Sequence, residues 1–159
     1  MSDNEISEIL DKTFSGNEIR RVLLVSPPDG SSEMFRFETG RRRRYTNFPP
    51  YGLGIIAKNL ESIGIKVHIE NLNHTILKAV HEVSSKNSFD FNSIWRKAIK
   101  ERIQYFCPDL IGVTCMFTMT HQSLKRVCEY ISSFDIPIAI GGVHVTNDAD
   151  RVLDDIQSV

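Results

Sequence analysis

Three stretches of the chain combine residue types that could bind a flat, partly polar ligand. Residues 115–120 read Cys-Met-Phe-Thr-Met-Thr, which joins hydroxyl groups to large, polarisable apolar side chains. Residues 141–146 begin with two glycines, which allow a backbone to approach a ligand closely. Residues 26–51 form the third and longest stretch. Each stretch follows an apolar run, so all three would meet if those runs were parallel strands, because ligands of such sheets bind at the carboxyl ends.

Other familiar arrangements of reactive residues are missing from the sequence. No turn carries GxGxxG, no GxxxxGK[ST] occurs, and Gly52 and Gly54 lie inside a helical pattern. The five histidines form no HExxH pair, so we interpret them as surface residues. Cys107, Cys115 and Cys128 form no CxxC or CxxxCxxC, and we expect them to be buried as small apolar side chains. The residues alone therefore indicate neither a catalytic group nor a metal site.

Four apolar runs separated by helical patterns must position these stretches. The strands are expected at residues 22–25, 66–70, 110–114 and 136–140. The first long helix opens at Pro49-Pro50, carries an apolar stripe through Leu53, Ile56, Ala57, Leu60 and Ile63, and stops at Gly64. Further helices are expected around residues 76–80, 91–106 and 119–133 and from about Asn147. This alternation predicts an α/β fold with a parallel sheet and helices on both faces.

The connection from residue 26 to 50 contains four consecutive arginines, Arg41 to Arg44. Long connections without regular structure are uncommon in compact domains and are often functional or mobile. Two interpretations stay open. The arginines form part of a solvated, flexible loop, or they clamp phosphate or carboxylate groups of a ligand or a neighbouring domain.

Length and charge limit the function classes. The chain has 159 residues and a formal net charge of −1, which fits one globular domain after a polar lead-in at residues 1–19 with a short amphipathic helical turn. A near-neutral charge argues against a nucleic-acid partner. No apolar run approaches the roughly 20 residues that a membrane span needs, and no targeting segment is visible, so we expect a cytoplasmic protein without a membrane partner.

Four motifs, in this order, resemble the N-terminal cobalamin-binding domain of radical S-adenosylmethionine enzymes. They are residues 22–28 (VLLVSPP), 49–57 (PPYGLGIIA), 109–122 (DLIGVTCMFTMTHQ) and 137–144 (PIAIGGVH). The subgroup that is most similar contains the anaerobic magnesium-protoporphyrin ester cyclase and related methyltransferases. The resemblance runs from about residue 20 to the end, so the domain would span residues 20–159. It implies a flavodoxin-like, three-layer fold with strand order 2-1-3-4-5, and cobalamin at the strand ends.

The resemblance also implies two groups of site residues. The nucleotide tail of cobalamin would be lined by Thr114, Cys115, Thr118, Gly141 and Gly142. The corrin ring would lie near Tyr51, Leu53, Met116, Phe117 and His144. Two simpler explanations stay open, because Thr114 and Cys115 could serve strand-end packing and the glycine pair could serve only a tight turn.

The axial ligand is expected to differ from that of methionine synthase and the mutases, which use Asp-x-His-x-x-Gly after the first strand. No histidine lies between residues 26 and 54, and no histidine has Asp two residues before it. The resemblance therefore implies base-off cobalamin without a protein histidine from that loop.

The family continues beyond the point where this sequence stops. We expect the fifth strand, and a barrel whose CxxxCxxC binds a [4Fe–4S] cluster and S-adenosylmethionine, in a missing part of a longer chain. This module would itself be non-catalytic and would present cobalamin to the barrel, with a small-molecule substrate that the sequence does not identify. The unpaired edge of the fourth strand predicts self-association. The alternative function is a flavodoxin-like interaction or regulatory domain without a cofactor.

Overall fold

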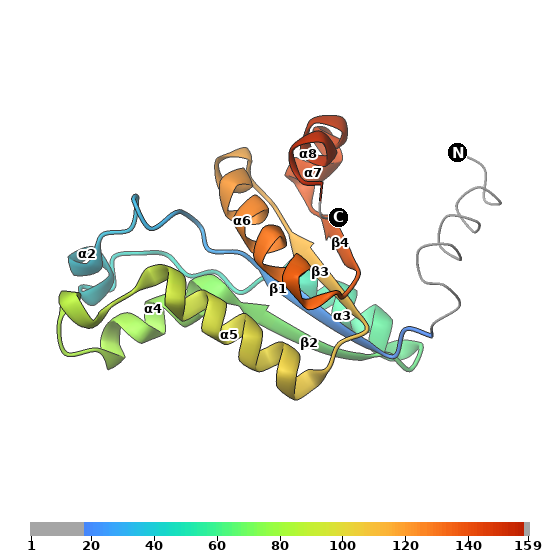
Figure 1. Cartoon of the computed structure of the whole chain (residues 1–159), viewed down its shortest axis with the longest axis horizontal. Helices are drawn as coiled ribbons and strands as arrows, with labels where there is room; N and C mark the ends of the chain where they lie inside the picture. Colours follow the sequence, from blue (N-terminus) through green and yellow to red (C-terminus); the bar gives the residue numbers. More distant parts are fainter. Residues whose placement is uncertain (1–17, 158–159) are drawn as a thin grey trace.

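A four-stranded parallel sheet forms the centre of the fold in the computed structural model, which describes residues 18–157 (Figure 1). The strands are β1 (Arg21–Ser26), β2 (Lys66–Asn71), β3 (Leu110–Thr114) and β4 (Ile138–Gly141). Their order is β2-β1-β3-β4, which confirms the flavodoxin-like order that was predicted. The expected lead-in helix lies outside the described residues. Within residues 18–157, no helix has the length and apolar character needed to cross a membrane.

Three helices pack on one face of the sheet and bury most of the core. They are α4 (Leu72–Glu82), α5 (Phe91–Phe106) and α6 (His121–Ile131). Polar caps fix where two of them begin, because the side chains of Asn71 and Asp90 accept hydrogen bonds from the backbone amides of His74 and Ser93. Figure 1 shows α5 and α6 in front of the sheet and α3 (Tyr51–Ser62) behind it.

Helix α3 covers much less of the other face. Leu53 and Ala57 are buried against Val22 and Leu24 of β1. The predicted buried stripe is wrong at two positions, because Ile56 is 48% exposed and Ile63 is 73% exposed. The helix packs over β2 and β1 through Leu53, Ala57 and Leu60, and Ile56 faces away from this contact. Gly64, with φ +88°, follows the last turn as predicted.

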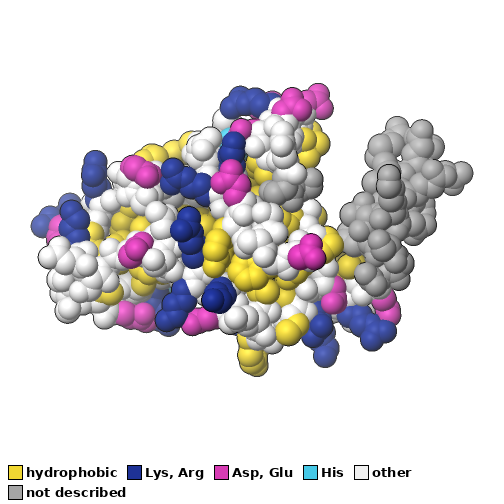
Figure 2. All heavy atoms as spheres, in the orientation of Figure 1, with side chains coloured by type: hydrophobic (Ala, Val, Ile, Leu, Met, Phe, Trp, Pro, Cys, Tyr) yellow, Lys and Arg dark blue, Asp and Glu magenta, His cyan; other side chains and the backbone are white. Residues whose placement is uncertain are grey.

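The connection after β1 contains regular structure, which the interpretation as a flexible loop did not expect. It contains a short helix, α2 (Phe37–Arg41), whose Phe37 is buried. The guanidinium group of Arg41 donates hydrogen bonds to the carbonyl oxygens of Val80 and Val83, both at 3.1 Å. Arg41 is thus exposed but held by two backbone contacts, and a clamp for phosphate or carboxylate groups at the arginines stays a prediction. Residues 42–44 are exposed, and Figure 2 shows Lys and Arg side chains gathered over α2.

Short elements complete the chain. The last helix that was predicted from about Asn147 corresponds to α8 (Ala149–Asp155), and a further short helix that was not predicted, α7 (Val143–Asn147), precedes it. Three 3₁₀ turns, η1 (Lys86–Ser88), η2 (Thr118–Thr120) and η3 (Ser132–Phe134), join the longer elements. Among the described strands β4 pairs only with β3, so self-association through its free edge stays a prediction.

Candidate functional site

The loops that follow β3 and β4 meet at the carboxyl end of the sheet. The amide of Cys115 donates to the carbonyl oxygen of Gly141 at 2.7 Å, and the amide of His144 donates to the carbonyl oxygen of Cys115 at 3.2 Å. These bonds extend the pairing of β3 with β4 past the last strand residues. Two of the three stretches that were predicted to meet therefore do so through direct contacts.

The third stretch, after β1, takes a different course. The amide nitrogen of Asp29 donates to Asn73 of α4 at 3.4 Å, and Glu33 lies 3.5 Å from the Arg126 guanidinium of α6. This stretch therefore runs over the helices of the well-packed face before it reaches Tyr51 at the start of α3. Tyr51 is 78% exposed.

The paired glycines have two different physical roles. Gly142 has φ +105°, and a Cβ added to it would overlap the carbonyl oxygen of Cys115. The backbone contact with Cys115 therefore requires a glycine at position 142 whether or not a ligand is bound. Gly141 has no such restriction, since a Cβ there would meet no atom within 4 Å. Gly141 thus borders open space, whereas Gly142 serves the turn.

On the α3 side of the sheet, β4 and the carboxyl half of β3 carry only small side chains, whereas Leu110 at the start of β3 packs against the core beneath α3. Thr114 pairs with Gly141, and Gly112 pairs with Ala139, so these four residues point to the same side. Leu24 reaches over Gly112, because its Cδ2 would lie 2.8 Å from a Cβ at that position. Ala139 is exposed, and Thr114 and Gly141 are half-buried. We name the surface formed by Thr114, Ala139 and Gly141 the small-residue face; it lies on the α3 side of the sheet.

Exposed apolar residues follow Thr114 of the small-residue face in the sequence. Met116 and Phe117 follow β3 directly and are 49% and 63% exposed, and Thr118 is also exposed. Large apolar side chains grouped at the carboxyl end of a sheet commonly mark a binding surface. The predicted site residues that a ligand could reach are thus Tyr51, Thr114, Met116, Phe117, Thr118 and Gly141.

Three predicted site residues are buried. Leu53 packs against β1 beneath α3, with 5% of its surface exposed. The Cys115 thiol lies in the core on the α6 side, where it donates to the carbonyl oxygen of Phe117 at 3.4 Å. His144 is 4% exposed. A ligand on the small-residue face could therefore contact the backbone of Cys115 but not its thiol, which lies on the other side of the sheet.

The cysteines agree with the prediction at two of three positions. Cys115 and Cys128 are buried, and burial raises the pKa of both thiols, that of Cys128 to about 12. Cys107 is exposed, which corrects the prediction for this residue. It caps the carboxyl end of α5 in a left-handed conformation, with φ 47°, where the chain leaves the helix.

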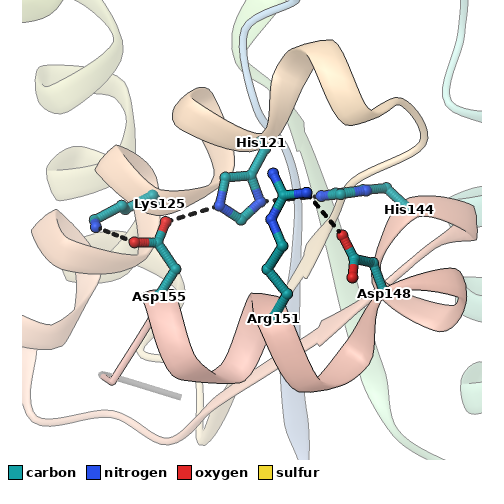
Figure 3. A network of polar contacts seen from close by, with 6 residues as sticks. All are labelled: His121, Lys125, His144, Asp148, Arg151 and Asp155. Carbon is teal, nitrogen blue, oxygen red and sulfur yellow. Dashed lines mark hydrogen bonds and ion pairs between the residues drawn. The ribbon is translucent and has the colours of Figure 1, made fainter.

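Two histidines form a buried pair at the carboxyl end of the sheet, which corrects their interpretation as surface residues. His121 Nδ1 lies 3.0 Å from His144 Nε2 (Figure 3). His121 Nε2 lies 2.8 Å from a carboxylate oxygen of Asp155, and His144 Nδ1 lies 3.3 Å from the Thr118 hydroxyl. All four ring nitrogens thus have partners, so burial leaves no polar atom unsatisfied. His74 and His81 are exposed, as predicted.

The histidine pair contacts a partly exposed ion pair, which Asp155 forms with Lys125. Lys125 Nζ lies 2.6 Å from the second carboxylate oxygen of Asp155. The hydrogen bonds from Lys125 and then from His121 hold the pKa of Asp155 below its usual range. Asp155 in turn raises the pKa of Lys125. Asp155 is therefore a carboxylate throughout the neutral pH range.

Sequence reasoning missed His121 and Asp155 as members of this cluster. The useful signal for His121 was its position as the first residue of a helix that follows a loop rich in hydroxyl and apolar groups. Asp155 gave no signal, because it is one of several acidic residues near the end of the sequence. Among residues 18–157, no group of three or more His, Cys, Asp or Glu side chains is arranged to hold a metal ion.

Comparison with known families agrees with this arrangement of strands and loops. A search of curated proteins finds no significant match for the chain. The family model of the B12 binding domain matches residues 40–158, which is well over half of the sequence. This match supports cobalamin as the ligand of the fold described above. The chain belongs to the B12-binding domain family.

Proposed function

We propose that this chain is the cobalamin-binding module of a radical S-adenosylmethionine enzyme, and that it binds cobalamin in the base-off form. Membership of the B12-binding family supports the ligand, and the order of the four sequence motifs supports the enzyme class. The observation that carries the proposal is the small-residue face. It combines open space beside the sheet with exposed apolar side chains at the carboxyl ends of the strands.

The residues present fit the two chemically distinct parts of cobalamin. The small-residue face, Thr114, Ala139 and Gly141, leaves room for the nucleotide tail along β3 and β4. Met116 and Phe117 offer polarisable apolar surface to the corrin ring. Thr118 adds an exposed hydroxyl group next to Phe117, and Tyr51 offers one at the start of α3. In this proposal Leu53, His144 and the side chain of Cys115 support the site from beneath.

When bound, cobalamin supplies a cobalt ion that can accept and release a methyl group or electrons, and the chain's residues bind and orient it. The positions and hydrogen bonds of the histidines support the base-off form. Residues 26–54 contain none, and both ring nitrogens of His121 and of His144 are hydrogen-bonded inside the protein. The barrel, its [4Fe–4S] cluster and S-adenosylmethionine would belong to a longer polypeptide.

An absorption titration with hydroxocobalamin tests the binding surface. Ala139→Phe and Gly141→Val fill the small-residue face, and we expect each to weaken binding at least about tenfold while the melting temperature stays close to that of the parent. Ala149→Phe is the matched control, because Ala149 is exposed on α8 away from this face, and it should bind as the parent does.

The outcomes separate the proposal from its alternative. If the parent protein binds no cobalamin, a cofactor-free interaction domain becomes the better description. If Ala139→Phe binds as tightly as the parent, cobalamin uses another surface. For the bound cobalt(II) form, nitrogen superhyperfine splitting from an imidazole in the paramagnetic resonance spectrum would contradict base-off binding. The enzyme class is tested by the reading frame, in which a downstream CxxxCxxC motif would support it.

A further inference from the structure

A continuous chain of polar contacts links the loop after β3 to the protein surface. It begins at the exposed Thr118, whose hydroxyl lies 3.3 Å from His144 Nδ1. It then passes from His144 to His121 at 3.0 Å and ends at Asp155 at 2.8 Å (Figure 3). Thr118 lies next to Phe117, and His144 follows Gly142 by two residues. The chain of contacts therefore joins both loops of the candidate site and leads away from it through buried groups.

We propose that His121 and His144 share one titrating proton, which sets the hydroxyl of Thr118 as a donor or an acceptor and so makes cobalamin binding pH-dependent. This inference rests on the proposed function, because cobalamin is taken as the ligand beside Thr118. His121, His144 and Asp155 would act as positioning residues, since the structure places them behind the site and not at its surface.

With both imidazole rings neutral, each of the three hydrogen bonds from Thr118 to Asp155 has its donor on the side of Thr118. The Thr118 hydroxyl donates to His144 Nδ1, His144 Nε2–H donates to His121 Nδ1, and His121 Nε2–H donates to the Asp155 carboxylate. The hydrogen of Thr118 is then used inside the protein. Only the lone pairs of its oxygen can face a ligand.

One added proton reverses the direction of the hydrogen bond between Thr118 and His144. His144 then carries hydrogens on both ring nitrogens, and its Nδ1–H donates to the oxygen of Thr118. The hydroxyl hydrogen of Thr118 is released and can point to a ligand. Thr118 thus changes from an acceptor to a donor, while the other contacts of the pair are kept.

The charges around the pair leave it as the group that responds to pH. Its charged neighbours are Lys125 on α6, Asp148 just before α8, and Arg151 and Asp155 on α8 (Figure 3). The two carboxylates offset the two cations, and Asp148 and Arg151 pair with each other at 3.3 Å. The Asp155 carboxylate is the charged group in direct contact with the pair, 2.8 Å from His121 Nε2.

The expected direction follows from the chemistry of cobalamin. Its tail contains an anionic phosphodiester, and its side chains contain amide carbonyls, so it offers acceptors to a donor hydroxyl. Binding should therefore tighten as the pH falls through the titration of the pair. For one linked proton the dissociation constant changes by at most about tenfold per pH unit.

Equilibrium dialysis with cyanocobalamin between about pH 5.5 and 8 tests the coupling, because the cyanide ligand does not titrate in this range. We expect the parent to bind at least about threefold more tightly at the lower pH. His121→Gln and His144→Gln should bind with a flat pH profile. His81→Gln removes an exposed histidine on α4 as the matched control and should keep the parent's profile.

Each result decides a different question. Binding that is independent of pH in the parent, or a His121→Gln profile equal to the parent's, would overturn the coupling alone. Absence of binding at every pH would overturn the proposed function and the coupling with it. If the histidine variants do not fold, Asp155→Asn decides, because this carboxyl is partly exposed and its loss should move the midpoint of the profile to lower pH. An unmoved midpoint would contradict the proposal.

Discussion

The two faces of β3 and β4 differ in the size of their side chains and in what covers them. On the side of α5 and α6, Ile111 and Val113 of β3 and Ile138 and Ile140 of β4 belong to or pack against the main core. On the side of α3, the same strands present Gly112, Thr114, Ala139 and Gly141. From Ile111 onward in β3 and throughout β4, a bulky side chain and a small one thus alternate, while Leu110 at the start of β3 fills the α3 side; in the sequence both strands look uniformly apolar.

The difference shows why small residues can indicate a ligand surface. A small residue beneath a helix is explained by close packing, as at Gly112 beneath Leu24. Ala139 and Gly141 have no such explanation, because one is exposed and a Cβ on the other would meet no atom within 4 Å. Larger apolar residues would suit a strand better at both positions, so their absence is consistent with space kept for a ligand.

The largest expected effect tests the packed face. Ile111 is fully buried between β1, β4 and the helices, and Ile111→Ala should lower the free energy of unfolding by about 2–5 kcal/mol. Thr114→Ala on the small-residue face is the control, and its cost should stay below about 1 kcal/mol. Urea denaturation of both variants measures the difference. Equal losses would mean that the two faces are packed alike.

The next effect separates the two glycines. Gly142→Ala places a methyl group against the carbonyl oxygen of Cys115 in a conformation that favours glycine, so we expect a loss of about 1–3 kcal/mol. Gly141→Ala should change stability by less than about 1 kcal/mol, since space is free around it. A melting temperature for Gly142→Ala equal to that of the parent would contradict the contact with Cys115. This pair also explains why only Gly141 can be used to test ligand binding.

Much of the fold could be predicted because it depends on local patterns. Apolar runs identified all four strands to within about two residues, and the alternation of strands and helices implied their parallel pairing. The prediction failed where distant residues decide the structure. Helix α2 packs in an aromatic cluster, where the ring of its Phe37 lies 5.3 Å from that of Phe89, a contact that no local pattern contains.

The candidate site was predictable in position but not in detail. The sequence located the loops after β3 and β4, because ligand sites of parallel sheets lie there. It could not distinguish Gly141 from Gly142, since their difference depends on the position of Cys115. It also missed the pairing of His121 with His144, because each ring is buried only by virtue of the other and of Asp155.

A smaller change in stability is expected at the carboxyl ends of α3 and α5, which lie on opposite faces of the sheet. The turn after α3 uses Gly64 at φ +88°, whereas α5 ends at Cys107 with φ 47°. Cys107→Gly should therefore raise stability by about 0.5–1 kcal/mol, because glycine adopts this conformation without steric cost. Gly64→Ala should lower stability by about 1 kcal/mol for the opposite reason. Thermal unfolding measures both, and a loss of stability in Cys107→Gly would contradict the assigned strain.

The smallest effect tests how little of the α3 side is packed. Ile56 is 48% exposed although it belongs to the apolar stripe of α3, so replacing it removes little buried surface. Glutamine also has a slightly higher helix propensity than isoleucine, which offsets part of any lost contact. We therefore expect Ile56→Gln to change the free energy of unfolding by no more than about 0.5 kcal/mol. Leu53→Ala in the same helix is the control, and its buried side chain should cost about 2–5 kcal/mol. Urea denaturation measures both variants. A loss above about 2 kcal/mol in Ile56→Gln would mean that α3 covers more of the sheet than the structure indicates. The contrast between the two faces would then be weaker.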